Sequence, residues 1–251
     1  PAEWYTGHNY HETQVFGANL NATTDWVLGR TTAGLEFRNE GVKSNVLGKL
    51  MDEPQDVPFA DGVQYTKSDN RSNISYFLEH NIILQRLTLS AGVLANYHSS
   101  LNDGVRFYPG VDMSYRIGSD FRLYGSWNRA LRMPTFTDLY YESKVIKGNP
   151  NMKPEESEAF EVGLKYNTHF LKAYIAGFYR KGKNMIDWIK ESPEDEAWQS
   201  RNLTKVDNLG FETSVSLFPR ELGNNRFFIR KAEVSYAFIN QDKDSEGLIS
   251  N

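Results

Sequence analysis

The side chains best suited to ligand chemistry are aromatic and guanidinium groups in two long polar parts of the sequence. They are Arg132, Tyr140, Tyr141, Trp188, Trp198 and Arg201. Aromatic rings supply apolar contact area and guanidinium groups supply charge, so together they suit a large, flat, amphipathic ligand. The alternative is that these residues form an aromatic belt or hold the loops together. The sequence therefore provides six candidate ligand-binding residues.

No arrangement of residues predicts an enzyme or a metal site. The chain has no cysteine, which excludes thiol catalysis, disulfides and cysteine metal ligands. His8 and His11 are three residues apart, and on a strand that spacing places them on opposite faces. The acidic stretch 52–61 offers carboxylates to calcium but lacks a known loop spacing, which favours a solvated loop. We therefore expect no catalytic residue, no metal and no cofactor.

Alternation of apolar and polar residues predicts about ten β-strands. The clearest alternation runs from 86 to 98, where one face carries Leu87, Leu89, Ala91, Val93, Ala95 and Tyr97. Six alternate apolar positions match the roughly 9–11 residues of a tilted membrane strand. A further strand is predicted over 26–38, after a poorly patterned one over 11–20. The stretches 39–71 and 182–205 are predicted to be long polar excursions, and prolines keep 134–154 out of regular structure.

Short and long connections alternate along these predicted strands. Tight turns at 85–86, 118–120 and 167–169 are separated by longer polar segments. In an up-and-down sheet, alternate connections lie on the same edge, so every short turn falls on one rim, as in outer-membrane barrels. We therefore predict an all-β fold, an antiparallel up-and-down transmembrane β-barrel. The alternative is a soluble β-sandwich or β-barrel binding module that recognises glycan or protein through aromatic loops, with Val93 and its neighbours in a dry core.

Composition narrows the choice of partners. The net charge is −4 with 24% charged residues, so no polybasic surface exists and no nucleic-acid partner is expected. Aromatic residues reach 14% while hydrophobic residues are 39%, a combination that suits a membrane barrel but also an aromatic-rich soluble domain. No run of about 18 apolar residues predicts a transmembrane helix. The start of the chain carries no signal-peptide pattern, which predicts a processed chain or an internal piece of a longer one.

Two segments in the middle of the chain carry a family resemblance. The first is Arg-Met-Pro-Thr-Phe-Thr-Asp-Leu-Tyr at 132–140, and the second is Gly-Asn-Pro-Asn-Met-Lys-Pro-Glu at 148–155. Each borders an alternating strand, and an upstream segment at 34–45 fits the same strand-to-loop pattern. Together they resemble the barrel of TonB-dependent outer-membrane receptors, in which Leu usually stands where this chain has Met152. The resemblance extends over most of the chain.

That resemblance implies a function and a location. Receptors of this family bind and import a scarce nutrient such as cobalamin or an iron–siderophore complex across the outer membrane of Gram-negative bacteria. The implied partners are outer-membrane lipid, the small-molecule nutrient chelate and the energy-transducing protein TonB, which acts through a plug domain. Ligand binding would fall to the six loop residues named first.

The number of strands predicts an incomplete barrel. A plugged transporter barrel has about 22 strands, whereas this chain provides about ten. Residues 1–251 are therefore predicted to be a single partial barrel domain that lacks the plug domain and the remaining strands. Unpaired strand edges are costly in lipid. We expect an open sheet that associates through its edges, not a closed ten-stranded barrel.

Overall fold

The computed structural model describes residues 8–101, 104–222, 228–244 and 249–250. Ten long strands dominate: β1 (His11–Trp26), β2 (Gly29–Ser44), β4 (Gln64–Ile83), β5 (Leu87–His98), β6 (Val105–Ile117), β7 (Phe121–Arg132), β9 (Glu155–Asn167), β10 (Leu171–Lys190), β11 (Trp198–Leu217) and β12 (Ala232–Asp244). The minor elements are β3 (Lys49–Asp56), β8 (Ile146–Lys147), β13 (Ile249–Ser250), helix α1 (Phe136–Tyr140) and the 3-10 turn η1 (Pro219–Leu222). The fold is thus nearly all β, as predicted.

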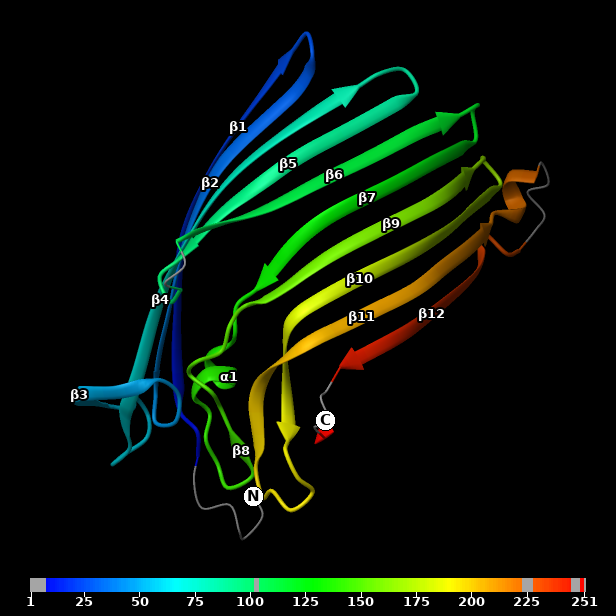
Figure 1. Cartoon of the computed structure of the whole chain (residues 1–251). Coiled ribbons are helices and arrows are strands. Elements are labelled where there is room, and N and C mark those ends of the chain that lie inside the picture. The colour runs from blue at the N-terminus through cyan, green and yellow to red at the C-terminus, as the bar shows by residue number, and fades with distance from the viewer. Residues whose placement is uncertain (1–7, 102–103, 223–227, 245–248, 251) are drawn as a thin grey trace.

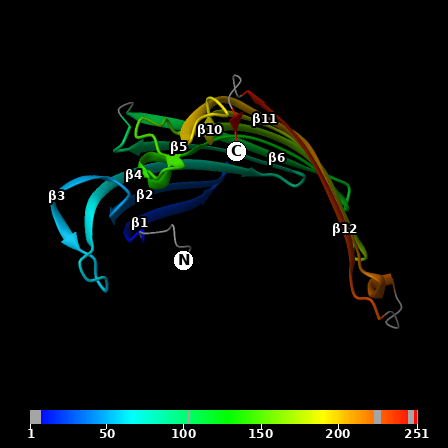
Figure 2. The ribbon, with the colours of Figure 1, turned by 90° about the horizontal axis from the view of Figure 1, so that it is seen from below.

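The ten long strands form one continuous antiparallel meander. Their spatial order is β1-β2-β4-β5-β6-β7-β9-β10-β11-β12, while β3, β8 and β13 pair at the margins of β4, β11 and β10. Seen from below, the sheet is an arc, like a section cut from the wall of a cylinder (Figure 2). Within the described residues, β1 pairs only with β2 and β12 only with β11, so both edges are free. The predicted open, partial barrel is therefore confirmed.

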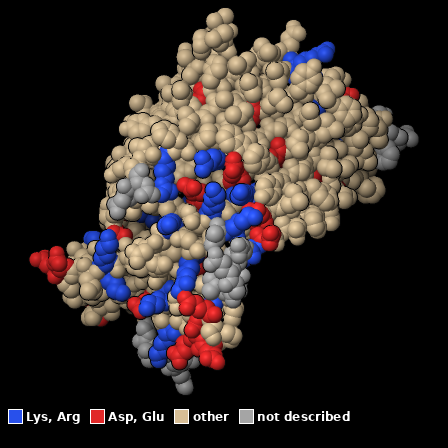
Figure 3. Space-filling view, viewed as in Figure 1, with Lys and Arg blue, Asp and Glu red and all other residues tan. Residues whose placement is uncertain are grey.

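The convex face of the sheet is apolar and uncovered. Large apolar side chains on it remain substantially exposed, including Tyr76 (55%), Leu78 (51%), Val93 (36%), Val162 (59%) and Ile175 (52%). Figure 3 shows this face almost free of charge over most of the strands. A soluble module would bury these residues under a second layer, and a wall facing lipid leaves them outside. The single-sided face predicted around Val93 is confirmed, and the soluble alternative is wrong.

Charged groups mark the edge of this apolar face on the side of the long connections (Figure 3). Trp127 donates its indole N–H to Glu158 at 2.8 Å, and the Tyr179 hydroxyl donates to Asp207 at 2.8 Å. Asp207 in turn lies 3.0 Å from the amine of Lys205. Aromatic residues with polar tips gather where hydrocarbon meets water. The strands therefore continue beyond the lipid-facing band into a water-exposed region.

The connections are sorted between the two rims (Figure 1). Short turns after β1, β4, β6 and β9 lie together with the β11–β12 connection at the upper right, and β3, α1 and β8 lie at the opposite rim. The layout is that of an outer-membrane barrel, whose short turns face the periplasm and whose long loops face outward. Proline and polar residues predict a further turn at 219–225; part of it, and most of the polar tail at 247–251, lie outside the described residues.

The structure corrects the predicted strand at 26–38. Trp26 ends β1 and pairs with Gly29, which begins β2, so Val27 and Leu28 form the turn of a hairpin. Gly29 has φ of +132°, and an added Cβ would meet the carbonyl oxygen of Asn81 at 2.0 Å. Two apolar residues concealed this turn because Val and Leu are not typical turn formers. The poorly patterned first strand is in fact 16 residues long.

The predicted polar excursions are also corrected. Most of 39–71 belongs to β2, β3 and β4, and 182–205 is largely the paired ends of β10 and β11, joined at 191–197. A small core lies in this second extension, where Ile189, Leu203 and Val206 are buried against Met185. The segment 134–154 is not wholly irregular, because it holds helix α1. The extended ends of β2, β4, β10 and β11 lie beyond the lipid-facing band, so the alternation that marks a membrane strand is absent from them.

Candidate functional site

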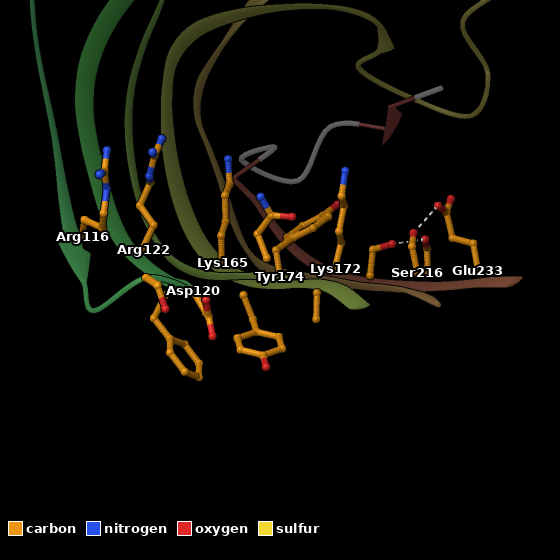
Figure 4. A pocket seen from close by; sticks show the side chains of 15 residues that line it. Arg116, Asp120, Arg122, Lys165, Lys172, Tyr174, Ser216 and Glu233 are labelled. Atoms are coloured by element: carbon orange, nitrogen blue, oxygen red, sulfur yellow. Dashed lines mark hydrogen bonds between the residues drawn. The ribbon is translucent and has the colours of Figure 1, made fainter. Parts of the chain in front are cut away.

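The concave face of the sheet presents polar side chains from neighbouring long strands. Toward the short-turn rim it holds a hollow of about 580 Å³ whose floor is built from β6, β7, β9, β10, β11 and β12. Lysine and arginine side chains from neighbouring strands rise side by side into this space (Figure 4). Successive side chains of a strand point to opposite faces of the sheet. Phe121, Leu123 and Leu164 point to the convex face, so the cations next to them in sequence point into the hollow.

Four cations form what we term the cation row: Arg116, Arg122, Lys165 and Lys172. Arg116 lies opposite Arg122 in the β6–β7 ladder, and Arg122 lies opposite Lys165 in the β7–β9 ladder. Within the part of the chain that the structure describes, none of the four has a carboxylate within 4 Å. Lys165 lies over the ring of Tyr124 and Lys172 over that of Phe218, and neither ring neutralises a charge.

A second hollow, of about 290 Å³, lies on the concave face between β2, β4, β5 and the end of β7. At its edge Arg71 donates to Glu40 at 3.0 and 2.7 Å and to the carbonyl oxygen of Pro134 at 2.6 Å. The same guanidinium lies 4.5 Å from the centre of the Phe136 ring. Arg71 therefore fastens the start of the long connection 133–154 to a strand on the other side of the hollow.

The part of the connection that Arg71 contacts belongs to the first family-like segment, 132–140. Thr135 caps helix α1 in a capping box, in which Thr135 Oγ1 accepts from the Asp138 N–H and the Asp138 carboxylate accepts from the Thr135 N–H. Arg132 donates two hydrogen bonds to Glu155, at 2.5 and 2.7 Å. Glu155 also accepts from the N–H of Ile186 on β10 at 2.7 Å. The two motif segments thus meet at the point where the excursion leaves and rejoins the sheet.

The pKa values of Glu155 and Tyr140, at the base of the excursion, are displaced from their ordinary values. Burial raises the pKa of Glu155, but hydrogen bonds from Arg132 and from the Ile186 N–H outweigh it and hold the pKa below its ordinary 4.5. For Tyr140, burial and a hydrogen bond to Asp69 both raise the pKa well above 10. Glu155 is therefore ionised and Tyr140 neutral at neutral pH, the states that their hydrogen bonds require.

The six predicted ligand-binding residues lie on the long-loop side but in separate groups. Arg132 is held by Glu155, and the Tyr140 hydroxyl donates to Asp69 at 2.8 Å. The Tyr141 hydroxyl accepts from the Asn9 amide at 3.3 Å. These three are at or beside α1, whereas the other three, Trp188, Trp198 and Arg201, lie on β10 and β11.

The β10–β11 group also has partners of its own. Lys190 lies 5.2 Å from the centre of the Trp198 ring, and Arg201 is ion-paired with Glu191. Trp198 pairs with Ile146 in the β8–β11 ladder, which links this group to the excursion 133–154. None of the six lines either hollow described above. Their role in binding therefore stays a prediction.

Sequence reasoning missed the cation row. Alternation places Arg116 and Arg122 on the polar faces of their strands, but nothing in the sequence indicates that they meet Lys165 and Lys172. The available signal was that each cation lies at the polar phase of its strand, close to a short turn. For metals, the described residues hold no group of three or more His, Cys, Asp or Glu side chains suited to an ion.

A curved antiparallel wall with an apolar outer face, a polar inner face and sorted rims defines part of a transmembrane β-barrel of the outer-membrane type. No helix of the described residues is long and apolar enough to cross a membrane. A family model described as TonB dependent receptor-like, beta-barrel, matches residues 2–250. The chain belongs to that family, whose members are receptors and transporters, not an enzyme class.

Individual relatives agree with this assignment. The chain is 26% identical over 287 residues to the vitamin B12 transporter BtuB of Vibrio vulnificus, covering 91% of this chain and 46% of the relative. The vitamin B12 transporter BtuB of Photobacterium profundum is 24% identical over 188 residues, covering 74% and 30%. The chain therefore spans about half, or less, of the length of these relatives.

Solved structures show the same fold. The siderophore receptor PirA from Pseudomonas aeruginosa superposes with a TM-score of 0.71 at 18% identity, covering 94% of this chain and 41% of that one. The copper transporter OprC superposes with a TM-score of 0.72 at 17% identity, covering 95% and 39%. At these identities the likeness concerns the fold alone.

Proposed function

We propose that this chain is part of the wall of an outer-membrane receptor that binds a scarce nutrient chelate and imports it. The observation that carries the proposal is the match of nearly the whole chain to the receptor barrel family, combined with an apolar convex face and a polar concave one. An outer membrane supplies the lipid that the convex face needs. Import against a gradient requires energy, which in this family comes from TonB acting through the plug domain.

Cobalamin is the first nutrient to test, and an iron–siderophore complex is the second. The two named sequence relatives are vitamin B12 transporters, and the structural likenesses include siderophore receptors. Aromatic rings and arginines at the long-loop rim suit either ligand, since both are large and partly flat. The six candidate residues are proposed to contribute to this binding.

The test is uptake by the intact receptor in a Gram-negative host that lacks its own cobalamin and siderophore receptors. We expect uptake of one radiolabelled chelate that depends on both the receptor and TonB. A host lacking TonB is the matched control, because ligand binding at the cell surface should persist there while uptake stops. Absence of uptake and of surface binding for both chelates, with the barrel correctly assembled, would contradict the proposal.

A further inference from the structure

The long-loop rim of the sheet is uneven, and the connection 133–154 lies where the strands are short. The neighbouring strands β5, β6, β7 and β9 have 12 or 13 residues, whereas β4, β10 and β11 have 20 each. The registers put the extra length of β4, and that of β10 and β11, at the long-loop rim. The connection lies between these two extensions (Figure 1), so it can contact strands that are not its neighbours in the sheet.

On one side the connection is held by two side chains of β4. Asp69 and Arg71 are two residues apart on the strand, so they point to the same face. Arg71 donates to the carbonyl oxygen of Pro134 at 2.6 Å, and Asp69 accepts from the Tyr140 hydroxyl at 2.8 Å. Arg71 is 12% exposed and its other donors bond to Glu40, which fixes its position. One strand therefore holds helix α1 near its start and at its last residue.

On the other side the connection is held by β11. The Asn202 side chain makes two hydrogen bonds to the backbone of Lys153, accepting from its N–H at 2.8 Å and donating to its carbonyl oxygen at 2.9 Å. The Trp198 N–H donates to the carbonyl oxygen of Val145 at 2.9 Å. Between β4 and β11 lie five other strands of the sheet, so the connection links two distant parts of the wall.

The outgoing and returning halves of the connection form one body. The Asn149 N–H donates to the carbonyl oxygen of Asp138 at 2.9 Å, and the Gly148 N–H donates to that of Tyr141 at 2.7 Å. A Cβ on Gly148 would lie 2.9 Å from the backbone nitrogen of Tyr140, so the two halves approach more closely than a side chain would allow. A shift at the β4 attachment is therefore transmitted to the part that β11 holds.

We propose that Asp69 and Arg71 are positioning residues for ligand binding. They fix the connection at β4 while β11 fixes it at the other end, so the two separate groups of candidate ligand residues form one surface. The proposal rests on the proposed function in taking these groups as part of the ligand site. A surface that is already ordered loses less conformational entropy when it binds. Removal of the β4 attachment should therefore weaken binding, although neither residue needs to touch the ligand.

Titration of arginine variants of the purified intact receptor tests this role, with cobalamin and ferric enterobactin as probes. We expect Arg71→Gln to raise the Kd about tenfold. Arg38→Gln is the matched control, because Arg38 pairs with the same Glu40 carboxylate at 2.7 Å and lines the same hollow. Among the described residues Arg38 has no hydrogen bond to the connection, so its loss should leave the Kd unchanged. Arg71→Lys keeps the charge but lacks the guanidinium fork, and full recovery of affinity with lysine would overturn the proposal.

Hydrogen exchange of the same variants without ligand separates positioning from direct contact. We expect faster exchange from α1 to Asn149 in Arg71→Gln and wild-type exchange in Arg38→Gln. Wild-type exchange in Arg71→Gln, or faster exchange with an unchanged Kd, would overturn the proposal. If the wild type binds neither probe, the proposed function fails, and exchange still decides whether Arg71 positions the connection.

A double-mutant cycle tests Asp69. Asp69→Ala and Tyr140→Phe remove the same hydrogen bond, so the double variant should bind no more weakly than the weaker single variant. Lys49→Ala is the control, because Lys49 is the other partner of Asp69, 3.8 Å away and 74% exposed, and its loss should leave the Kd unchanged. Additive losses in the double variant would show that Asp69 does not act through Tyr140 and would overturn its positioning role.

Discussion

Arg132, the last residue of β7, lies directly opposite Glu155, the first residue of β9, and its guanidinium donates two hydrogen bonds to the Glu155 carboxylate. This pair closes the ladder at the base of the 133–154 excursion. The Glu155 side chain is 8% exposed and that of Arg132 48%, so one partner is buried and the other half in water. The contact explains why the two family-like segments both carry a charged residue at the sheet boundary.

Neutralising Glu155 should loosen this excursion. Glu155→Gln keeps the shape but removes the charge, and we expect the local stability of 133–154 to fall by about 1–2 kcal/mol, the cost of weakening a charged hydrogen bond that is half exposed. Hydrogen exchange of the intact receptor measures this as faster exchange around α1. Glu191→Gln is the control, because its partner Arg201 forms an exposed ion pair. Equal protection in Glu155→Gln and the wild type would show that the pair does not hold the excursion.

Acid should have the same effect as this substitution. The pKa of Glu155 is lowered in the folded protein, so its stabilisation is complete above the ordinary value of 4.5 and is lost as the pH falls through the lower folded value. We expect proteolytic cleavage within 133–154 to be unchanged between pH 7 and 5 and to increase below about 4. An acid-stable protease provides the measurement. In Glu155→Gln this increase should be smaller, and an identical pH profile in the two proteins would assign it to another group.

A charge on the convex face should block membrane assembly. Val93 is on the apolar side of β5, and arginine near the bilayer midplane costs about 2–4 kcal/mol. We expect Val93→Arg to reduce the amount of assembled intact receptor in outer-membrane fractions. Ser90→Arg, on the polar side of the same strand, is the control and should assemble at the normal level. Normal assembly of Val93→Arg would place that position out of contact with lipid.

Loss of the tryptophans near the long-loop rim should weaken binding of the nutrient. We expect Trp188→Ala and Trp198→Ala in the intact receptor each to raise the Kd about tenfold, equivalent to about 1.4 kcal/mol. Titration of purified receptor with the chelate measures this, and normal heat-modifiable migration checks that the barrel has formed. Tyr236→Ala, on the convex face, should leave the Kd unchanged. If both tryptophan variants bind normally, these side chains belong to loop packing.

The free edges of β1 and β12 should make the isolated chain associate. An unpaired strand exposes a row of N–H and C=O groups, each of which costs several kcal/mol in hydrocarbon. We expect residues 1–251 in detergent to form oligomers or aggregates, measured by light scattering after size-exclusion chromatography. The intact receptor should give one defined species under the same conditions. A stable monomer of the isolated chain would mean that its edges are satisfied in some other way.

The sequence by itself determined the faces of the membrane strands. Around Val93, and from Phe121 to Trp127, alternate residues must meet lipid while their neighbours meet water, so a period of two is written into the residues. The tight turn at 118–120 was also predictable, because it contains a glycine. In the structure Gly118 has φ of +66°, a conformation that glycine adopts without steric cost. The motif segments at 132–140 and 148–155 indicated the family because each is a run of consecutive residues, which can be recognised without knowing the fold.

Only the tertiary structure decided what happens beyond the lipid band and across strands. The hairpin turn at Val27 and Leu28 and the extensions of β10 and β11 lie beyond the lipid-facing band, so no alternation of lipid-facing and water-facing residues marks them. The cation row depends on the registers of β6, β7 and β9, which bring Arg116, Arg122 and Lys165 together from sequence positions up to 49 apart. A register is a property of paired strands, and no single strand records which residue of its neighbour it will face.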